Sequence, residues 1–314
     1  MVAEAPLTST DPAAWPAERV SALAETTLPL SCVILTRGDR WAALAKAIDS
    51  VRAQHGPPVD LVLVLNGGIA SDQVPPGVRL IELADNIGVP GGRNVGVAAS
   101  TGDVVMFLDD DGWLPDRGTA NRLRAAFAAR PQLGIVSFRI LDPETGWTAR
   151  RHVPRVRVGD AERSSSVTSF LGGACAIRRV VFDRCGELPA AFFYSHEETD
   201  LAWRALDAGF EIVYDAGAIM CHPTTDPSTR HPSFFQNNAR NRVWLARRRL
   251  PALLVPVYLA TWVGITVLRH REPRVLSAWW RGFAEGWRTD PGPRRPIRWR
   301  TVWTMTRLGR PPVI

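Results

Sequence analysis

Three consecutive aspartates, Asp109 to Asp111, directly follow the apolar run Val104–Leu108. Residues i and i+2 of an extended chain point to the same side, so we expect Asp109 and Asp111 to share a face while Asp110 points elsewhere. Two carboxylates on one face repel each other unless a positive charge lies between them. A hard divalent cation that also holds a diphosphate would supply that charge through oxygen ligands. A solvated acidic turn is the alternative, but the preceding buried strand favours a metal site.

The elements that would position these aspartates form a regular pattern in the first half of the chain. Short, continuously apolar runs predict strands, and they alternate with segments of helical periodicity. Such strands are typical of a mostly parallel sheet with helices on both faces. The predicted strands are Leu30–Leu35, Asp60–Leu65, Val78–Leu83 and Val104–Leu108, and the predicted helices are Trp41–Ala53 and Asn94–Ser100, the second opened by a glycine-rich turn.

Ligands of such α/β sheets bind beyond the carboxyl ends of the strands. The informative residues are therefore those directly after each strand, and most of them are polar or acidic: Thr36–Asp39, Asn66, Asp85–Asn94 and Asp109–Asp111.

The second half of the chain is less regular, and we expect it to complete one α/β domain over residues 29–249. Its predicted elements are a loop-rich Ser137–Arg157, a small-residue strand at Phe170–Ile177, a helix at Thr199–Ala208, a short strand at Glu211–Tyr214, a segment around Ile219 that leads to His222, and a helix at Phe234–Arg249.

Composition narrows the class of protein. Hydrophobic residues make up 46% and charged residues 22%, which excludes fibrous and largely disordered chains. Four cysteines without a CxxC pair indicate buried free thiols and a reducing compartment. Residues 1–28 have neither the basic start nor the apolar run of a secretory signal, so we expect a flexible N-terminal lead-in.

Three blocks of the sequence carry a family resemblance. They are the glycine-rich run Asp85–Gly96, the segment Phe107–Asp111 and the later block Phe192–Arg204. In this order and spacing they resemble family 2 glycosyltransferases of the GT-A fold, a Rossmann-like α/β architecture. The resemblance covers roughly Leu30 to Arg249.

The resemblance implies a donor site for a nucleoside-diphosphate sugar. The glycines would let backbone amides approach the nucleotide, because they have no Cβ. Asp109 and Asp111 would hold Mg²⁺ or Mn²⁺ on the diphosphate, with His222 as a further ligand, although a structural role for His222 is equally plausible. The implied nucleotide-sugar residues are Thr36, Arg37, Asp39, Asn66, Asn86, Gly88, Arg93, Asn94, Asp109 and Arg240.

A catalytic base is implied by the run Glu197–Leu201, which matches the family's Glu-Asp-x-Asp-Leu. The second acid of that motif removes the proton of the acceptor hydroxyl, and here it is Glu198, one methylene longer than aspartate. Glu197 or Asp200 could take the role instead. The alternative for Asp200 is an ion pair with Arg204 four residues on. Arg240 with Asn241 resembles a pair that contacts the diphosphate, and a basic helix face is the alternative.

The C-terminal segment, residues 250–314, is predicted to be a helical extension rich in arginine and tryptophan. From Arg230 onward there are seventeen arginines and three acidic residues, although the whole chain carries only +7. Leu250–Leu268 is nearly as long as a membrane span, but Pro251, Pro256 and basic flanks on both sides argue against one. Arginine interleaved with tryptophan favours attachment of 240–314 to an anionic membrane surface. A true span and a packed subdomain are the alternatives.

Together these features predict an inverting, metal-dependent hexosyl- or deoxyhexosyltransferase. It would act on a glycan or lipid-linked acceptor in cell-envelope glycan synthesis, as a cytoplasmic protein on the inner face of the cell membrane. The alternative is a non-catalytic sugar-nucleotide-binding or scaffold protein of the same fold, supported only by the glutamate at position 198. Nucleic-acid binding by the basic tail is the weakest alternative, since no recognised motif accompanies it, and no nucleic-acid partner is expected.

Overall fold

The computed structural model describes residues 28–68, 74–157, 159–224 and 231–314. Nearly all of the predicted N-terminal lead-in, residues 1–28, therefore lies outside the described residues. So does Arg230, where the basic part of the chain begins.

One eight-stranded sheet, in the order β3-β2-β1-β4-β7-β5-β8-β6, runs through the described chain. Its first half is parallel, as the apolar runs predicted, and consists of β1 (Leu30–Thr36), β2 (Asp60–Asn66), β3 (Arg79–Leu83) and β4 (Val104–Asp109). The second half is mixed and consists of β5 (Leu133–Leu141), β6 (Ser165–Ser166), β7 (Ala174–Arg178) and β8 (Glu211–Cys221). Here β7 runs antiparallel between β4 and β5.

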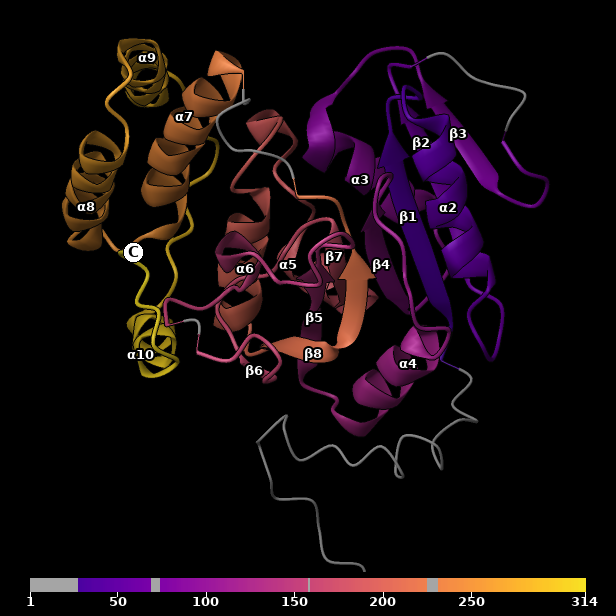
Figure 1. Cartoon of the computed structure of the whole chain (residues 1–314). Coiled ribbons are helices and arrows are strands. Elements are labelled where there is room, and N and C mark those ends of the chain that lie inside the picture. Colours follow the sequence, from indigo (N-terminus) through magenta and orange to yellow (C-terminus); the bar gives the residue numbers. More distant parts are fainter. Residues whose placement is uncertain (1–27, 69–73, 158, 225–230) are drawn as a thin grey trace, which may run out of the picture.

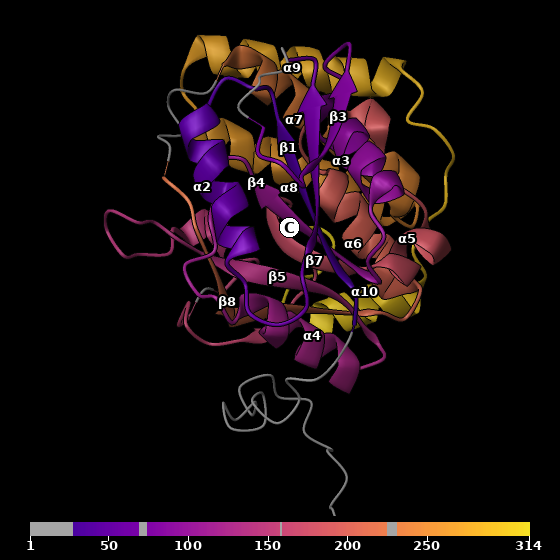
Figure 2. The ribbon, with the colours of Figure 1, turned by 90° about the vertical axis from the view of Figure 1, so that its right-hand side faces the viewer.

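Helices cover both faces of the sheet (Figures 1 and 2). Successive residues of β1 point to opposite sides: Val33 joins the core under α3, α5 and α6, whereas Cys32 and Ile34 join the core under α2 and α4. The predicted α/β fold, with a mostly parallel sheet between two helical layers, is confirmed. The helices are α2 (Trp41–Arg52), α3 (Gly88–Ala99), α4 (Thr119–Ala129), α5 (Arg179–Cys185), α6 (Glu197–Asp207), α7 (Pro232–Arg249), α8 (Leu254–Arg269), α9 (Pro273–Arg288) and α10 (Trp299–Arg307).

The glycine-rich run is helical, which corrects the prediction of a turn before Asn94. Helix α3 begins at Gly88 and includes Gly91, Gly92 and Gly96. A Cβ on Gly92 would overlap Leu35, and a Cβ on Gly96 would overlap Val33. These two glycines therefore let α3 lie close against the sheet.

The second half of the chain contains more strand than its sequence indicated. Residues 137–141 of the predicted loop belong to β5, and the residues from Glu211 to Cys221 form one bulged strand. The strand expected from Phe170 begins only at Ala174. Helix α4 and the start of β5 were not predicted at all. Strands β5 and β8 are largely buried, and the alternating pattern of a half-exposed strand is lost where both faces are covered.

Helices α8 and α9 lie beside α7 at one end of the sheet (Figure 1). Gly282 and Gly286 of α9 face α7, and a Cβ on Gly282 would overlap the backbone carbonyl of Gln236. Because of this close approach, α9 packs directly against the domain that ends at Arg249. No helix in the described part of the chain is both long and apolar enough to cross a membrane.

We predict that Gly282→Ala destabilises the protein by about 1–3 kcal/mol, because the added methyl group must push α9 away from α7. Gly264→Ala is the matched control: Gly264 lies inside α8 with open space around its Cβ position. It should leave stability unchanged or raise it by up to about 1 kcal/mol through helix propensity. Denaturant unfolding of both variants measures the difference, and equal stabilities would contradict the α7–α9 contact.

Candidate active site

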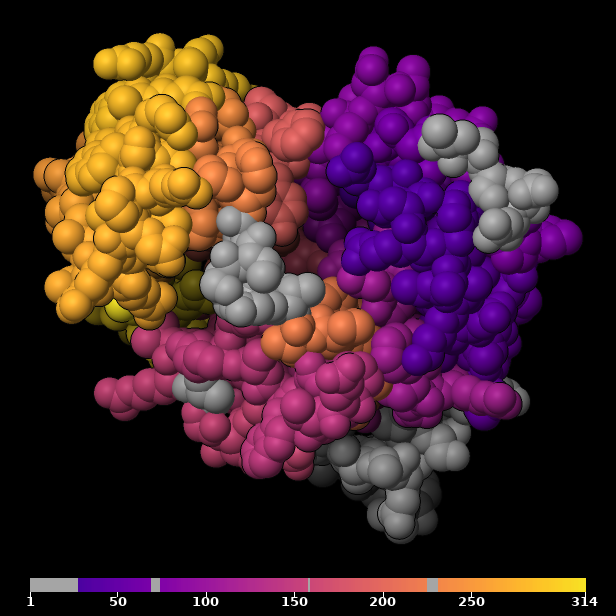
Figure 3. All heavy atoms as spheres, turned by 45° about the horizontal axis from the view of Figure 1, so that its top comes forward, coloured from indigo at the N-terminus to yellow at the C-terminus, as the bar shows by residue number. Residues whose placement is uncertain are grey.

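The carboxyl ends of the parallel strands bring most of the predicted site residues to one edge of the sheet. Seen toward this edge, the surface is hollowed between the half that carries β1 to β4 and the half that carries the C-terminal helices (Figure 3). Arg37 and Asp39 are exposed there, directly after β1.

Asp110, the middle aspartate of the triplet, lies in the turn after β4 and points into the protein. The expected shared face of Asp109 and Asp111 is not formed, because β4 ends at Asp109 and Asp111 pairs with Arg40, as Asp110 does. Asp110 is buried and accepts hydrogen bonds from Thr36 Oγ1 at 2.7 Å and from Arg40 Nη2 at 2.6 Å. Burial raises the pKa of Asp110, and its two donors act in the opposite direction. Arg40 also forms an ion pair with Asp111. Thr36 and Arg40 thus fix the end of β4, a role for Arg40 that its exposed loop position did not signal.

Arg93 is the centre of a buried ion cluster. Its guanidinium is 7% exposed and lies 3.2 Å from Asp109 Oδ1, 3.8 Å from Glu197 Oε1 and 3.9 Å from Glu198 Oε1. Burial would lower the pKa of Arg93, but the three carboxylates raise it. One side chain of α3 therefore joins the end of β4 to the start of α6.

Two glycines that sequence reasoning missed make room for this cluster. A Cβ on Gly172 would overlap Glu198 Oε1, and a Cβ on Gly173 would overlap the carboxylate of Asp109. Their only sequence signal was the small-residue character of the run before β7. Side chains at both positions would force the carboxylates away from Arg93.

Asp111 and His222 meet at the other side of the triplet. His222 Nε2 lies 3.0 Å from Asp111 Oδ1, and His222 Nδ1 is buried without a hydrogen-bond partner. Burial lowers the pKa of His222, but the carboxylate of Asp111 outweighs it and raises the pKa overall. An oxygen and an imidazole nitrogen at this separation have the chemistry and spacing of two ligands on one divalent cation.

The third predicted ligand does not join this pair. Asp109 faces Arg93 instead, and among the described residues no three His, Cys, Asp or Glu side chains are grouped to hold a metal ion. The residues present thus fit a divalent cation through two protein ligands, Asp111 and His222, with the remaining positions open to other oxygen donors.

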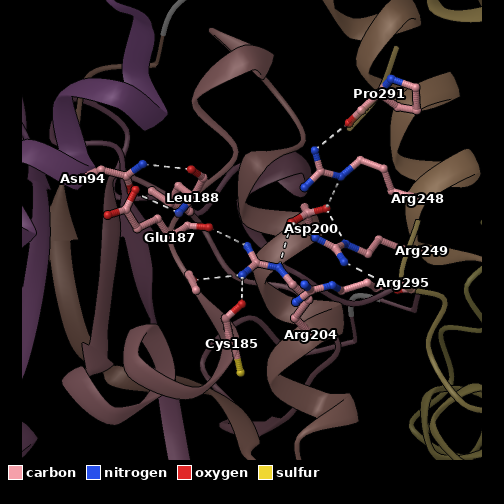
Figure 4. Close-up of polar contacts among 11 residues, drawn as sticks. Asn94, Cys185, Glu187, Leu188, Asp200, Arg204, Arg248, Arg249, Pro291 and Arg295 are labelled. Atoms are coloured by element: carbon pink, nitrogen blue, oxygen red, sulfur yellow. Dashed lines mark hydrogen bonds and ion pairs between the residues drawn. The ribbon is translucent and has the colours of Figure 1, made fainter. Parts of the chain in front are cut away.

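Four other predicted nucleotide-site residues hold the fold together around α3. Asn66 accepts a hydrogen bond from the Ile87 amide at 3.0 Å and donates to Asn86 Oδ1 at 3.1 Å. Gly88 has a left-handed φ of 81°, and a Cβ there would lie 2.5 Å from the Phe193 carbonyl oxygen. Asn94 exchanges two hydrogen bonds with the Leu188 backbone (Figure 4). The structure thus gives each of the three asparagine side chains a partner within the protein.

The loop before α6 is strained and is held by α7. Phe193, Ser195 and His196 all have positive φ, and each such non-glycine residue costs about 1–3 kcal/mol. Asn241 Nδ2 lies 2.8 Å from each of the Phe192, Tyr194 and Ser195 carbonyl oxygens. Arg240, predicted to contact the diphosphate, donates to the Phe192 carbonyl at 3.0 Å and pairs with Glu285 of α9. The Arg240–Asn241 pair thereby orients the start of α6.

Asp200 lies away from the other acids, within a cluster of arginines (Figure 4). It is 0% exposed, and its carboxylate lies 2.8 Å from Arg204 Nε, 2.7 Å from Arg249 Nε and 3.5 Å from Arg248 Nε. The expected ion pair with Arg204 is confirmed. A carboxylate enclosed in this way has no access to an acceptor hydroxyl, so the geometry does not bring Asp200 together with Glu197 and Glu198.

Comparisons with known proteins agree with this geometry. Residues 31–186 match the family described as Glycosyl transferase family 2. An uncharacterized glycosyltransferase of Nostoc sp. is 32% identical over 114 residues, 33% of this chain and 34% of that protein. The succinoglycan biosynthesis protein ExoO of Rhizobium meliloti is 36% identical over 101 residues, 29% of this chain and 28% of that protein. The matches thus span about a third of the length of these curated relatives.

Solved structures share the fold at low sequence identity. GalNAc-T7, crystallised with UDP, GalNAc and Mn²⁺, aligns over 92% of this chain and 59% of its own, with a TM-score of 0.63 and 14% identity. The mannosyltransferase PcManGT from Pyrobaculum calidifontis, in complex with GDP-Man and Mn²⁺, aligns over 93% of this chain and 90% of its own, with a TM-score of 0.55 and 16% identity. Residues 31–186 are therefore similar to the glycosyl transferase family 2 domain, and the chain has the GT-A fold of these solved structures.

Proposed function

We propose that this protein is an inverting glycosyltransferase that moves a sugar from a nucleoside diphosphate to a hydroxyl group of an acceptor. The observation that carries the proposal is the Arg93 cluster, in which Asp109 at the end of a parallel strand and Glu198 at the start of α6 lie on one guanidinium. A donor sugar held beyond the end of β4 would then have Asp109 on one side and the carboxylate base, Glu198, on the other.

Glu198 is the base that the geometry favours. Its side chain is 25% exposed, whereas Glu197 is 2% exposed and has one carboxylate oxygen without a partner. Burial, together with the neighbouring Glu198, raises the pKa of Glu197 well above that of an exposed glutamate and favours its protonated form. Burial also raises the pKa of Glu198, which brings it toward the range that suits a general base. Glu198 would accept the proton of the acceptor hydroxyl while that oxygen attacks the anomeric carbon from the face opposite the diphosphate.

Asp111 and His222 would hold a divalent metal ion, Mg²⁺ or Mn²⁺. When bound, such an ion stabilises the negative charge of the departing diphosphate. Two structurally similar proteins were crystallised with Mn²⁺ and either UDP or GDP-Man, which supports a nucleoside-diphosphate sugar as donor and a divalent ion as cofactor. The name of the relative ExoO supports a glycan or lipid-linked acceptor in envelope polysaccharide synthesis, with a hexosyl or deoxyhexosyl group transferred.

The competing function is sugar-nucleotide binding without turnover. The glutamate in place of the family's aspartate at position 198 favours it, and the enclosed position of Asp200 removes one substitute base. The two functions differ in whether a donor is hydrolysed or transferred once bound.

We predict metal-dependent release of nucleoside diphosphate from one member of a panel of UDP-, GDP- and dTDP-sugars. Glu198→Gln should lower the rate by about 10²–10⁴-fold while leaving donor binding intact, because only proton transfer is lost. Asp111→Asn and EDTA should each abolish the metal-dependent release of nucleoside diphosphate. Glu187→Gln, at an exposed position on the same side of the fold, is the control and should keep full activity. A donor that binds but is never turned over would establish the competing function.

A second prediction concerns the protonated state of Glu197. A carboxyl group whose pKa is raised in the folded state stabilises the fold at low pH and loses that contribution as pH rises through the folded pKa. Glu197→Gln should therefore gain stability relative to the wild type as pH rises from about 5 to 8, and then show a constant difference. Melting temperatures of both proteins across pH 5 to 9 test this. A difference independent of pH would show that Glu197 is ionised in the folded protein throughout.

We further propose that the protein attaches to the inner face of the cell membrane through its C-terminal helices. Helix α8 and the residues just before it present an exposed face made only of apolar residues and glycine. Leu253 is 75% exposed and Leu268 is 81% exposed. The rest of the face has the spacing of a helix stripe and consists of Ala252, Pro256, Val257, Ala260, Gly264 and Val267. Exposed Arg269, Arg271 and Arg274 follow, which fits a bilayer with anionic headgroups.

Flotation with phosphatidylglycerol-containing vesicles tests this attachment. The double variant Leu253→Ser/Leu268→Ser should bind at least about tenfold more weakly, since each leucine contributes roughly 1–2 kcal/mol on leaving water. Trp147→Ser removes an equally exposed apolar side chain outside the tail and should bind like the wild type. Equal binding of all three proteins, or none, would exclude α8 as the membrane-binding element.

A further inference from the structure

A cavity of about 120 Å³ lies between α6, α7, α8 and the chain after α10, away from the aspartate triplet. His196 and Thr199 line it from the start of α6, Arg242 from α7, Trp262 from α8, and Arg310 from the segment after α10. Most of its wall lies outside the segment that matches the family, residues 31–186.

The cavity wall contains polar atoms that lack partners. Arg242 Nε, His196 Nε2 and Trp262 Nε1 are buried and have no hydrogen-bond partner. Arg and Trp nitrogens can only donate hydrogen bonds, and the histidine nitrogen can donate when it carries the proton. Buried donors are normally satisfied, because an unmade hydrogen bond costs about 1–3 kcal/mol. Three such atoms around one cavity indicate a missing acceptor.

The charge of the cavity is also unbalanced. Arg242 is 7% exposed, and its other nitrogens have only neutral acceptors, Tyr258 Oη at 3.3 Å and Asn238 Oδ1 at 3.4 Å. Its guanidinium stacks 3.5 Å from the ring centre of Trp262. Arg310 donates to Ser169 Oγ at 2.6 Å. Burial lowers the pKa of both guanidiniums, and no carboxylate raises either one.

Other buried arginines of the protein have carboxylate or backbone carbonyl partners. Arg93 and Arg249 lie against carboxylates, and Arg124 donates to the Leu28 and Pro57 backbone carbonyls. Within the described residues, Arg242 and Arg310 form no ion pair with an Asp or Glu side chain. A buried and a half-buried cation without a counter-charge are unfavourable unless an anion enters.

We propose that this cavity binds a single phosphate group, held by Arg242 and Arg310 with further donors from His196 and Trp262. Guanidinium groups match phosphate oxygens in geometry and charge. A cavity of about 150 Å³ in another protein holds a benzene ring, so a slightly smaller one has room for the five heavy atoms of phosphate. The site is separate from the donor site and does not depend on the proposed transfer reaction.

The phosphate can come from solution or from a lipid headgroup. Trp262 and Tyr258, which line the cavity, belong to α8, the helix that also presents the exposed apolar face. Binding of a headgroup would therefore place acyl chains beside that face, whereas free phosphate would act as a structural counter-ion only.

Titration with inorganic phosphate, at constant ionic strength against chloride, tests the site. We expect a saturable rise in melting temperature and a saturable change in tryptophan fluorescence. Arg310→Met and Arg242→Met should each weaken phosphate binding by roughly tenfold or more. Arg310→Met is the safer variant, since Arg310 is less buried than Arg242. Arg300→Met, at an exposed position of α10, is the control and should bind like the wild type.

Two further binding measurements identify the source of the phosphate group. Glycerol 3-phosphate is compared with vesicles of phosphatidylcholine that contain phosphatidic acid. Tighter binding to the vesicles, lost in Arg310→Met but not in Arg300→Met, assigns the site to a lipid headgroup. Equal affinity for the soluble ester and inorganic phosphate assigns it to free phosphate. Unsaturable effects, or equal effects on Arg310→Met and the wild type, would mean charge screening only and would overturn the proposal.

Discussion

The site depends on the ion cluster around Arg93. Asp109, Glu197 and Glu198 come from two elements far apart in the chain, and without a cation between them they would repel one another. Removing one partner of a buried ion pair typically costs about 3–5 kcal/mol, because the remaining charge is left uncompensated. Arg93 thus sets the distance between the sheet edge and α6. Arg93 lowers the pKa of both glutamates, and burial acts in the opposite direction on each of them.

The same part of the site depends on residues beyond the segment that matches the family. Asn241 helps to hold the strained backbone from Phe193 to His196, because it donates to the Phe192, Tyr194 and Ser195 carbonyl groups. Asn241 lies on α7, and α7 is fixed by the close approach of Gly282 and Gly286 of α9. A change in α9 can therefore reach the position of Glu198 through α7 and one loop. Helix α9 thus contributes to the orientation of α6.

The sequence predicted the four parallel strands and the acids at their ends, because apolar runs and polar strand ends are local signals. It did not predict what those residues contact. Glycine composition indicated a turn at Gly88–Gly92, but close packing against Leu35 and Val33 makes the segment helical. The side chains of Asn66 and Asn94 form hydrogen bonds with backbone groups of the protein. Partners of this kind are set by tertiary contacts, which no local pattern contains.

The arginines of the basic tail fall into two groups that net charge alone does not separate. Some of its arginines neutralise acids of the α/β domain: Arg248 and Arg249 surround Asp200, and Arg298 pairs with Asp207. Those charges are already used within the fold and add little to attraction for an anionic surface. The arginines that follow the exposed face of α8 are oriented to solvent and remain available. Membrane affinity should therefore follow the few arginines beside α8 rather than the total charge of the tail.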